Sequence, residues 1–215
     1  MTTIFSAMAA SVDGYITGPD PNPDQPLGNG GNQLFDWYTT GDIPSAQFPG
    51  FRMSAVSRPV FDAIAARTGA VIAGRRTYDE SDGWGGGSPH PHAPLVVLSH
   101  RPPPPGRGDQ TFVASGIVEA IRVAAHLAGG RDVALMGSAV VAVALRAGLL
   151  DEVTIHQVPV LLGGGTALFG RAPSPVRLTA VDVVAAPGVT HLHYALHYAA
   201  EGHRASTPAE HGPRG

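Results

Sequence analysis

Short apolar runs alternate with segments of helical periodicity along the chain, and this alternation predicts an α/β fold. Residues 70–73 and 95–98 are wholly apolar, which is typical of strands buried on both faces of a parallel sheet. Residues 59–67 carry apolar side chains at helical spacing. The other predicted strands are 3–10, 111–114, 133–136, 153–161, 176–184 and 190–198; the other predicted helices are 117–127 and 140–147, with helical turns at 33–38 and near 78. We therefore expect a mostly parallel central sheet, helices on both faces and an antiparallel C-terminal edge.

The length of the chain fits one domain with one core. It has 215 residues, of which 43% are hydrophobic, and compact domains most often contain roughly 100–200 residues. We predict one domain over residues 1–200 and a disordered tail over 201–215, where apolar residues are almost absent. Residues 17–50 are rich in Gly, Pro and Asn, and long loops of this kind are commonly binding loops or lids.

Composition and charge exclude several classes of function. The formal net charge of −3 gives no basic surface for nucleic acid. The sequence contains no run of about 18 apolar residues, which is the length that a membrane-spanning helix needs. The N-terminal residues lack the basic region of a signal peptide, so we predict a cytoplasmic protein. Cysteine and lysine are both absent, which excludes disulfides, thiolate nucleophiles and lysine Schiff bases. The positive charge that would bind an anionic ligand must therefore come from arginine, histidine or helix termini.

The first candidate site follows the predicted strand 70–73. Gly74, Arg75, Arg76 and Thr77 lead from that strand into a helix, and Thr77 with Glu80 matches a capping box. A helix N-terminus at the carboxyl end of a parallel strand offers unpaired N–H groups and the positive end of the helix dipole, which suits a phosphate. The same pattern also fits an ordinary strand-to-helix turn with two solvated arginines.

Two further strand ends carry residues that suit a nucleotide. Leu98, Ser99, His100 and Arg101 end the strand 95–98 with a hydroxyl, an imidazole and a guanidinium, which could meet an adenosine phosphate or form a plain polar loop. Residues 136–140 are small or apolar around Gly137 and would let the backbone approach a pyrophosphate. No Gly-x-Gly-x-x-Gly motif occurs, so the standard dinucleotide fingerprint is absent.

Taken in order, these segments resemble dihydrofolate reductase-like proteins. The ordered motifs are Ser-Val-Asp-Gly-Tyr-Ile at 11–16, Gly-Arg-Arg-Thr-Tyr at 74–78, Val-Val-Leu-Ser at 96–99, Met-Gly-Ser at 136–138, Leu-Leu-Asp-Glu-Val at 149–153 and Pro-Val-Leu-Leu-Gly-Gly-Gly at 159–165. The most similar branch is the C-terminal reductase domain of the bacterial riboflavin-biosynthesis deaminase/reductase and its stand-alone relatives. The resemblance spans about residues 3–198 and implies a dihydrofolate reductase-like three-layer fold with NADPH as cofactor.

The resemblance assigns the cofactor to residues at four strand ends. It implies that Gly74 to Thr77 hold the pyrophosphate, that residues after Ser99 face the adenosine 2′-phosphate, and that Ala9 and Ile16 border the nicotinamide. Arginines at these positions favour NADPH over NADH, because a phosphate dianion needs fixed cations. The expected cofactor-binding residues are Ala9, Ile16, Gly74, Arg75, Arg76, Thr77, Leu98, Ser99, His100, Arg101, Met136, Gly137, Ser138, Ala139 and Val140.

Two positions depart from the family pattern. Tyr15 stands where riboflavin-pathway enzymes carry a lysine after Asp-Gly, so a sugar-phosphate substrate loses its expected partner. Gly137-Ser138 stands where the family favours two glycines. The expected small-molecule substrate is therefore a pterin, a pyrimidine, a flavin-like heterocycle or a carbonyl compound.

Two residues are candidates on the substrate side. In dihydrofolate reductases a carboxylate on the helix after the first loop fixes the pterin and assists its protonation, and Asp36, between Phe35 and Trp37, is the residue that corresponds. Burial against these aromatic residues would favour the protonated acid; a surface acid on an amphipathic turn is the alternative. His156 lies near a family position that faces the substrate, or it is a histidine satisfied within its strand.

Paired histidines and apolar strands bear on metal binding and on dimerisation. His90 with His92, and His191 with His193, would lie on one face of an extended segment, but no third ligand has clear spacing, so we predict no metal. The strand 153–161 and the C-terminal hairpin offer apolar surface for a homodimer.

Three functions are open at this point. The leading one is an NADPH-dependent reductase that transfers a hydride to a small heterocyclic or carbonyl substrate. The second is a catalytically inactive ligand-binding protein that keeps the same fold. The third is a reductase that uses a flavin or deazaflavin instead.

Overall fold

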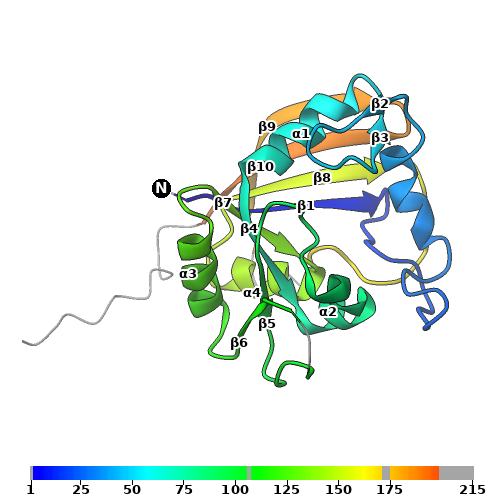
Figure 1. The fold of residues 1–215 in the computed structure, drawn as a ribbon. Helices are drawn as coiled ribbons and strands as arrows, with labels where there is room; N and C mark the ends of the chain where they lie inside the picture. Colours follow the sequence, from blue (N-terminus) through cyan, green and yellow to red (C-terminus); the bar gives the residue numbers. More distant parts are fainter. Residues whose placement is uncertain (1, 106–107, 171–174, 199–215) are drawn as a thin grey trace, which may run out of the picture.

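The computed structural model describes residues 2–105, 108–170 and 175–198. At its centre lies a mixed sheet of eight strands, whose arrangement is drawn in Figure 1. The strand order is β6-β5-β4-β7-β1-β8-β10-β9. The bounds are β1 Ile4–Ser11, β4 Thr68–Gly74, β5 Leu95–Leu98, β6 Thr111–Val113, β7 Asp132–Met136, β8 Glu152–Val158, β9 Arg177–Ala186 and β10 Val189–His197. Neighbouring strands from β6 to β8 are parallel, whereas β10 is antiparallel to both β8 and β9. The predicted sheet with its antiparallel C-terminal edge is confirmed.

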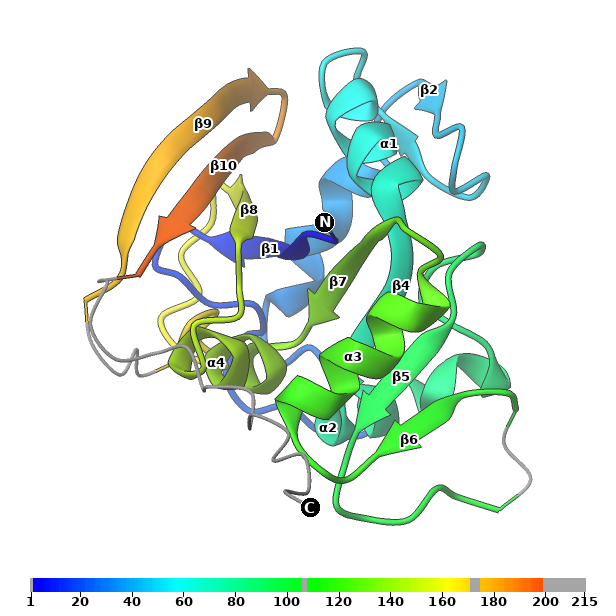
Figure 2. The same ribbon diagram turned by 90° about the vertical axis from the view of Figure 1, so that its left-hand side faces the viewer.

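Helices cover both faces of the sheet. On one face lie α3 (Ile117–Leu127) and α4 (Ser138–Arg146), and on the other lie α1 (Ser57–Arg67) and the 3₁₀ helix η1 (Gly31–Tyr38) (Figure 2). The short helix α2 (Arg75–Glu80) and the turn η2 (Asp82–Gly86) follow β4 directly, and the long loop also holds a two-stranded ribbon of β2 (Ile43–Pro44) and β3 (Arg52–Met53). The three-layer α/β architecture is therefore present.

The apolar run in β4 is explained by burial on both faces. Ala70 and Ile72 join the large core under α3 and α4, while Val71 and Ala73 join a second cluster with Tyr78 on the opposite face. Successive side chains of a strand point to opposite faces, so a strand between two helical layers needs apolar residues at every position.

Several element ends differ from the predicted ones. β4 begins at Thr68 instead of residue 70 and includes Gly69, where a Cβ would lie 2.6 Å from the Cβ of Arg131. Gly69 therefore serves close packing inside the strand. β8 ends at Val158, before Pro159, which has no N–H for the ladder. Neither the β2–β3 ribbon nor η2 had a predicted counterpart.

The outer strand β9 leaves Leu178, Val181 and Val183 exposed. This is the apolar surface to which the predicted homodimer refers, and the pairing of two copies stays a prediction. Among the helices in the described ranges, none has the length and apolar character needed to cross a membrane. The predicted tail 201–215 lies outside the described residues.

Candidate active site

The predicted cofactor segments meet at the carboxyl ends of four adjacent parallel strands, β5, β4, β7 and β1. Gly74 at the end of β4 is in register with Leu98 on β5, and Ala73 is in register with Met136 on β7. Parallel strands place their carboxyl ends at one edge of the sheet, which is where open α/β sheets bind ligands. The topology thus brings together segments that are far apart in sequence.

A cavity of about 600 Å³ opens at this edge, within the usual range for a ligand pocket. Of the predicted cofactor residues, eleven line it: Ala9, Ile16, Gly74, Arg75, Arg76, Thr77, Met136, Gly137, Ser138, Ala139 and Val140. Leu98, Ser99, His100 and Arg101 lie outside it on the neighbouring strand end. The Ser99 hydroxyl is used locally, because it donates to the carbonyl of Arg101 and accepts from the N–H of the same residue, each at 3.0 Å.

Glycine lets the turns after β4 and β7 touch. Gly137 has a φ of +94°, and a Cβ on it would lie 2.4 Å from the Thr77 Oγ1 atom. A Cβ on Gly74 would lie 3.2 Å from the Val140 Cγ2 atom. Helix α4 begins directly after Gly137 with no side-chain cap, so its first turn offers N–H groups and the positive dipole end toward this cradle. This combination suits a pyrophosphate.

The capping role expected of Thr77 and Glu80 is corrected by the structure. Helix α2 begins at Arg75, which puts Thr77 inside the helix, and no side chain caps its first turn. The Glu80 carboxylate instead accepts from the Arg76 Nε at 2.7 Å. The Thr77 hydroxyl is therefore available to the cavity that it lines.

Three arginines at this edge are already paired with carboxylates. The Arg75 Nε donates to Asp79 at 2.7 Å and its Nη1 donates to the carbonyl of Pro102 at 3.0 Å. The Arg101 Nη2 donates to the other oxygen of Asp79 at 2.8 Å. The side chains of Arg76 and Arg101 are 57% and 63% exposed, and exposed pairs of this kind contribute at most about 1 kcal/mol. Both guanidiniums can therefore exchange a carboxylate for a phosphate.

Ser138, where the family favours a second glycine, connects the cradle to a neighbouring loop. Its hydroxyl donates to the carbonyl of Ala167 at 2.7 Å, and Ala167 forms an isolated bridge with Tyr15. The N–H of Gly137 lies 3.3 Å from the Met8 Sδ atom on β1. The two positions that depart from the family pattern thus meet at one loop segment beside the cavity.

Of the two positions that the sequence left open for Asp36, buried or at the surface, the structure has the surface one. Asp36 is exposed and is not among the residues that line the cavity, whereas Phe35 and Tyr38 on the same 3₁₀ helix line it. Residues i and i+3 of a 3₁₀ helix lie directly above each other, so Phe35 and Tyr38 share a face from which Asp36 is excluded. The aromatic residues of this turn, and not its carboxylate, form the cavity wall.

Tyr38 and Trp84 are among the cavity residues that were not predicted from sequence. Desolvation raises the pKa of the Tyr38 phenol, so it remains protonated at neutral pH. Its ring stacks on Trp37 with centroids 4.0 Å apart, and its hydroxyl has no hydrogen-bond partner within the described residues. Trp84 lines the cavity from η2, where its φ of +49° is in the left-handed region between two glycines. The i, i+3 spacing of Phe35 and Tyr38 was a readable signal, whereas Trp84 gave none.

His156 lies in the interior instead of at the cavity, which corrects the expected substrate contact. It is 2% exposed, and its Nδ1 lies 2.8 Å from the Nδ1 of His191 on β10. The His191 Nε2 lies 3.0 Å from the Ser57 hydroxyl, and Trp37 packs against both imidazoles. Burial lowers the pKa of His156 to about 3 and that of His191 to about 4, so both are neutral at pH 7. The pair is part of the packing behind η1.

The other predicted histidine neighbours have separate contacts. The His193 Nε2 lies 3.1 Å from Glu152, and the His90 Nε2 lies 3.0 Å from the carbonyl of Ala65. Among the residues that the structure describes, no three His, Asp or Glu side chains converge on a point that could hold a metal ion.

Known proteins resemble this chain in sequence and in fold. The family model of the RibD C-terminal domain matches residues 2–192. A protein of predicted role in riboflavin biosynthesis from Shewanella sp. PV-4 is 25% identical with a TM-score of 0.65, and the match covers 92% of this chain and 100% of that one. A pyrimidine reductase-like protein from Corynebacterium diphtheriae is 14% identical with a TM-score of 0.59, over 92% and 93% of the two chains. No curated protein sequence gives a significant match.

A longer protein shares the fold. The diaminohydroxyphosphoribosylaminopyrimidine deaminase/5-amino-6-(5-phosphoribosylamino)uracil reductase of Thermotoga maritima is 12% identical with a TM-score of 0.56. The match covers 91% of this chain and 56% of that one, so this chain spans just over half of that protein. These neighbours confirm the dihydrofolate reductase-like fold, and the matched family is one of pyrimidine reductase domains, which supports an oxidoreductase. Since its family model covers nearly the whole chain, this chain belongs to the RibD C-terminal domain family.

Proposed function

We propose that this chain is an NADPH-dependent reductase of a flat heterocyclic substrate. The observation that carries this proposal is the cradle in which Gly137 touches Thr77, at the edge of a cavity that also has aromatic walls. A backbone surface without Cβ atoms at a helix N-terminus suits a pyrophosphate, and aromatic walls suit a planar ring. When bound, the reduced nicotinamide supplies the hydride.

The residues that fit the cofactor divide the cavity in two. The turns of Gly74 and Gly137 would hold the pyrophosphate through backbone N–H groups and the Thr77 hydroxyl. Ala9 and Ile16, which are 5% and 8% exposed, would form the wall beside the nicotinamide and keep water from it. Arg76 and Arg101 would supply the charge for a 2′-phosphate, with their present carboxylate partners as competitors.

Replacing Arg76 and Arg101 by alanine is expected to weaken the binding of NADPH much more than the binding of NADH. Loss of two charge-assisted contacts to a phosphate should weaken NADPH binding by roughly 10- to 100-fold, whereas NADH binding should change less than about threefold. Titration of each cofactor by fluorescence or calorimetry measures both values. Arg122→Ala is the matched control, because Arg122 is exposed on α3 and paired with Glu119 in the same way. Equal losses of affinity for NADPH and NADH would contradict the assignment of the 2′-phosphate to this edge of the sheet.

The substrate class follows from the other half of the cavity. Phe35, Tyr38 and Trp84 contribute aromatic side chains to its wall, and no charged residue stands among these three. A planar ring of the pyrimidine or pterin type would stack here, and the names of the related reductases point to pyrimidines. Tyr15 is the residue in place of the family lysine, so we expect a substrate without a sugar phosphate.

Tyr38 is the hydrogen-bond donor that this wall offers the substrate. Because the pKa of its phenol is raised by desolvation, the hydroxyl stays protonated and can donate to a ring carbonyl or nitrogen that gains negative charge as hydride arrives. Tyr38→Phe is expected to lower kcat by roughly 100-fold and to change KM much less. Tyr194→Phe, on β10, is the matched control. If Asp36→Asn lowers kcat and Tyr38→Phe does not, Asp36 takes the role instead.

The direct test of the function is titration with NADPH, NADH, FMN and a deazaflavin, followed by assays of pyrimidine and pterin substrates. Saturable NADPH binding with substrate-dependent NADPH oxidation is the expected result. Binding of only FMN or the deazaflavin would favour the flavin-type reductase. NADPH binding without turnover of any heterocycle would favour the inactive ligand-binding protein, and no binding at all would contradict both reductase hypotheses.

A further inference from the structure

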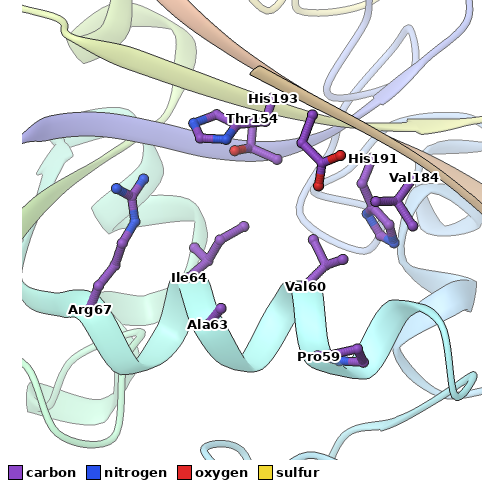
Figure 3. A pocket seen from close by; sticks show the side chains of 10 residues that line it. Pro59, Val60, Ala63, Ile64, Arg67, Thr154, Val184, His191 and His193 are labelled. Carbon is purple, nitrogen blue, oxygen red and sulfur yellow. The ribbon is translucent and has the colours of Figure 1, made fainter. Parts of the chain in front are cut away.

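A second cavity, of about 450 Å³, lies between helix α1 and the strands β8, β10 and β9 (Figure 3). The helix contributes Pro59, Val60, Ala63, Ile64 and Arg67, and the strands contribute Thr154, Asp182, Val184, His191 and His193. Figure 3 shows Val60, Ile64 and Arg67 directed from the helix toward the strands, and Thr154 facing them from the sheet. The volume is within the range of small-molecule pockets.

This cavity is separate from the proposed cofactor cavity. The two have no lining residue in common. Between them lies the packed group of Trp37, His156 and His191: the Trp37 ring centroid lies 4.9 Å from that of His156 and 5.1 Å from that of His191. Tyr38 lines one cavity and His191 lines the other, and Trp37 contacts both residues. A ligand in the second cavity would therefore occupy its own site.

Among the described residues, the lining of this second cavity holds one positive and one negative side chain, Arg67 and Asp182. Arg67 is the one guanidinium in its lining, and it is bound to two carboxylates, Asp132 at 3.3 Å and Glu152 at 2.7 Å. Burial alone would raise the pKa of Glu152, but Arg67 and His193 outweigh it and the pKa is lowered, so this carboxylate is ionised. Asp182 adds a further carboxylate. His191 is neutral, because burial lowers its pKa to about 4.

The polar groups with free capacity are mainly acceptors. Thr154 is only 3% exposed, and its hydroxyl makes no hydrogen bond within the described part of the chain. Asp182 accepts one bond, from the N–H of Val183 at 2.9 Å, which leaves its second oxygen free. Since ionised Glu152 can only accept, the His193 Nε2 donates to it, which leaves the His193 Nδ1 without a partner among the described residues. These groups can therefore accept N–H donors from a ligand in the cavity.

We propose that the second cavity binds a small primary amine in its protonated form, with a compact apolar body. The ammonium group would bring three N–H donors and a positive charge to Asp182, Thr154 and His193. Val60, Ile64 and Val184 give the apolar surface against which the body would pack. The proposal does not depend on the reductase function, because none of these residues belongs to the cofactor cavity.

Binding of 2-phenylethylammonium to the full-length protein tests this proposal, with 2-phenylethanol as the neutral isostere and 3-phenylpropanoate as the anion. Calorimetry should show the ammonium compound binding at least about tenfold more tightly than the alcohol, with no binding of the carboxylate. Chemical-shift changes of backbone amides should centre on α1 and β10. Equal affinity for the alcohol and the amine would overturn the ammonium assignment.

Variants locate the site and keep the test decisive. Asp182→Asn should weaken the ammonium compound about tenfold and leave the alcohol unchanged, while Asp24→Asn in the exposed loop is the matched control. Ala63→Phe should fill the space between helix and sheet and abolish amine binding, with melting temperature measured to show that the fold is intact. Binding that survives Ala63→Phe, or that NADPH displaces in direct competition, would overturn the proposal.

Discussion

Replacement of Gly137 by alanine is expected to remove cofactor binding while the protein still folds. The new Cβ would lie 2.4 Å from the Thr77 Oγ1 atom, so the threonine must rotate or the turn must move away from the cavity. Displacement of a positioned group by about 1 Å commonly costs on the order of 100-fold, and we expect NADPH affinity to fall by about that factor. The positive φ of Gly137 adds roughly 1–2 kcal/mol of strain, which should lower the melting temperature by about 5 °C.

Gly116→Ala is the matched control for this experiment. Gly116 also precedes a helix, α3, and has a similar φ of +103°, but no atom lies within 4 Å of the position of its Cβ. Its alanine variant should therefore show the same loss of stability as Gly137→Ala and unchanged NADPH affinity. If both variants bind NADPH as well as the parent, the contact between Gly137 and Thr77 is not part of a cofactor cradle.

The cofactor end of the site was readable from sequence because it depends on local signals and on topology. Gly74 and Leu98 end their strands and Gly137 follows directly after β7, and a parallel sheet places all such strand ends at one edge. The fold class followed from the same alternation of strands and helices. What sequence did not show is the contact between the turns of Gly137 and Thr77, since it depends on the register between β4 and β7.

The substrate end was harder to predict for reasons that are also physical. Helical periodicity of 3.6 and of 3 assign different faces to Asp36, and the observed 3₁₀ helix exposes it while Tyr38 lines the cavity. His156 alternates correctly along its strand, but its partner His191 is on a strand that follows much later in the chain. The second cavity lies between a helix and three strands, and no local sequence pattern predicts such a site.

Acidification from pH 7 to pH 5 is expected to destabilise the protein strongly through His156 and His191. Their pKa values in the folded protein are lowered by burial to about 3 and about 4, whereas an unfolded histidine has a pKa of about 6.5. Below pH 6.5 the unfolded chain therefore binds protons at these two histidines, whereas the folded protein does not. The stabilisation is complete above pH 6.5 and is lost as the pH falls toward 4.

The expected size of this effect is about 1 kcal/mol per pH unit for each histidine, or roughly 3 kcal/mol between pH 6.5 and 5. Thermal melts across this range should show the melting temperature falling by about 10 °C. The double variant His156→Gln/His191→Gln should be less stable at pH 7 but show a much shallower decline, whereas His126→Gln, an exposed position on α3, should keep the parental slope. The pKa values of Asp13, Glu119 and Glu152 are lowered, so these three carboxylates titrate below this range. An unchanged slope in the double variant would show that the buried imidazole pair is not the source of the acid sensitivity.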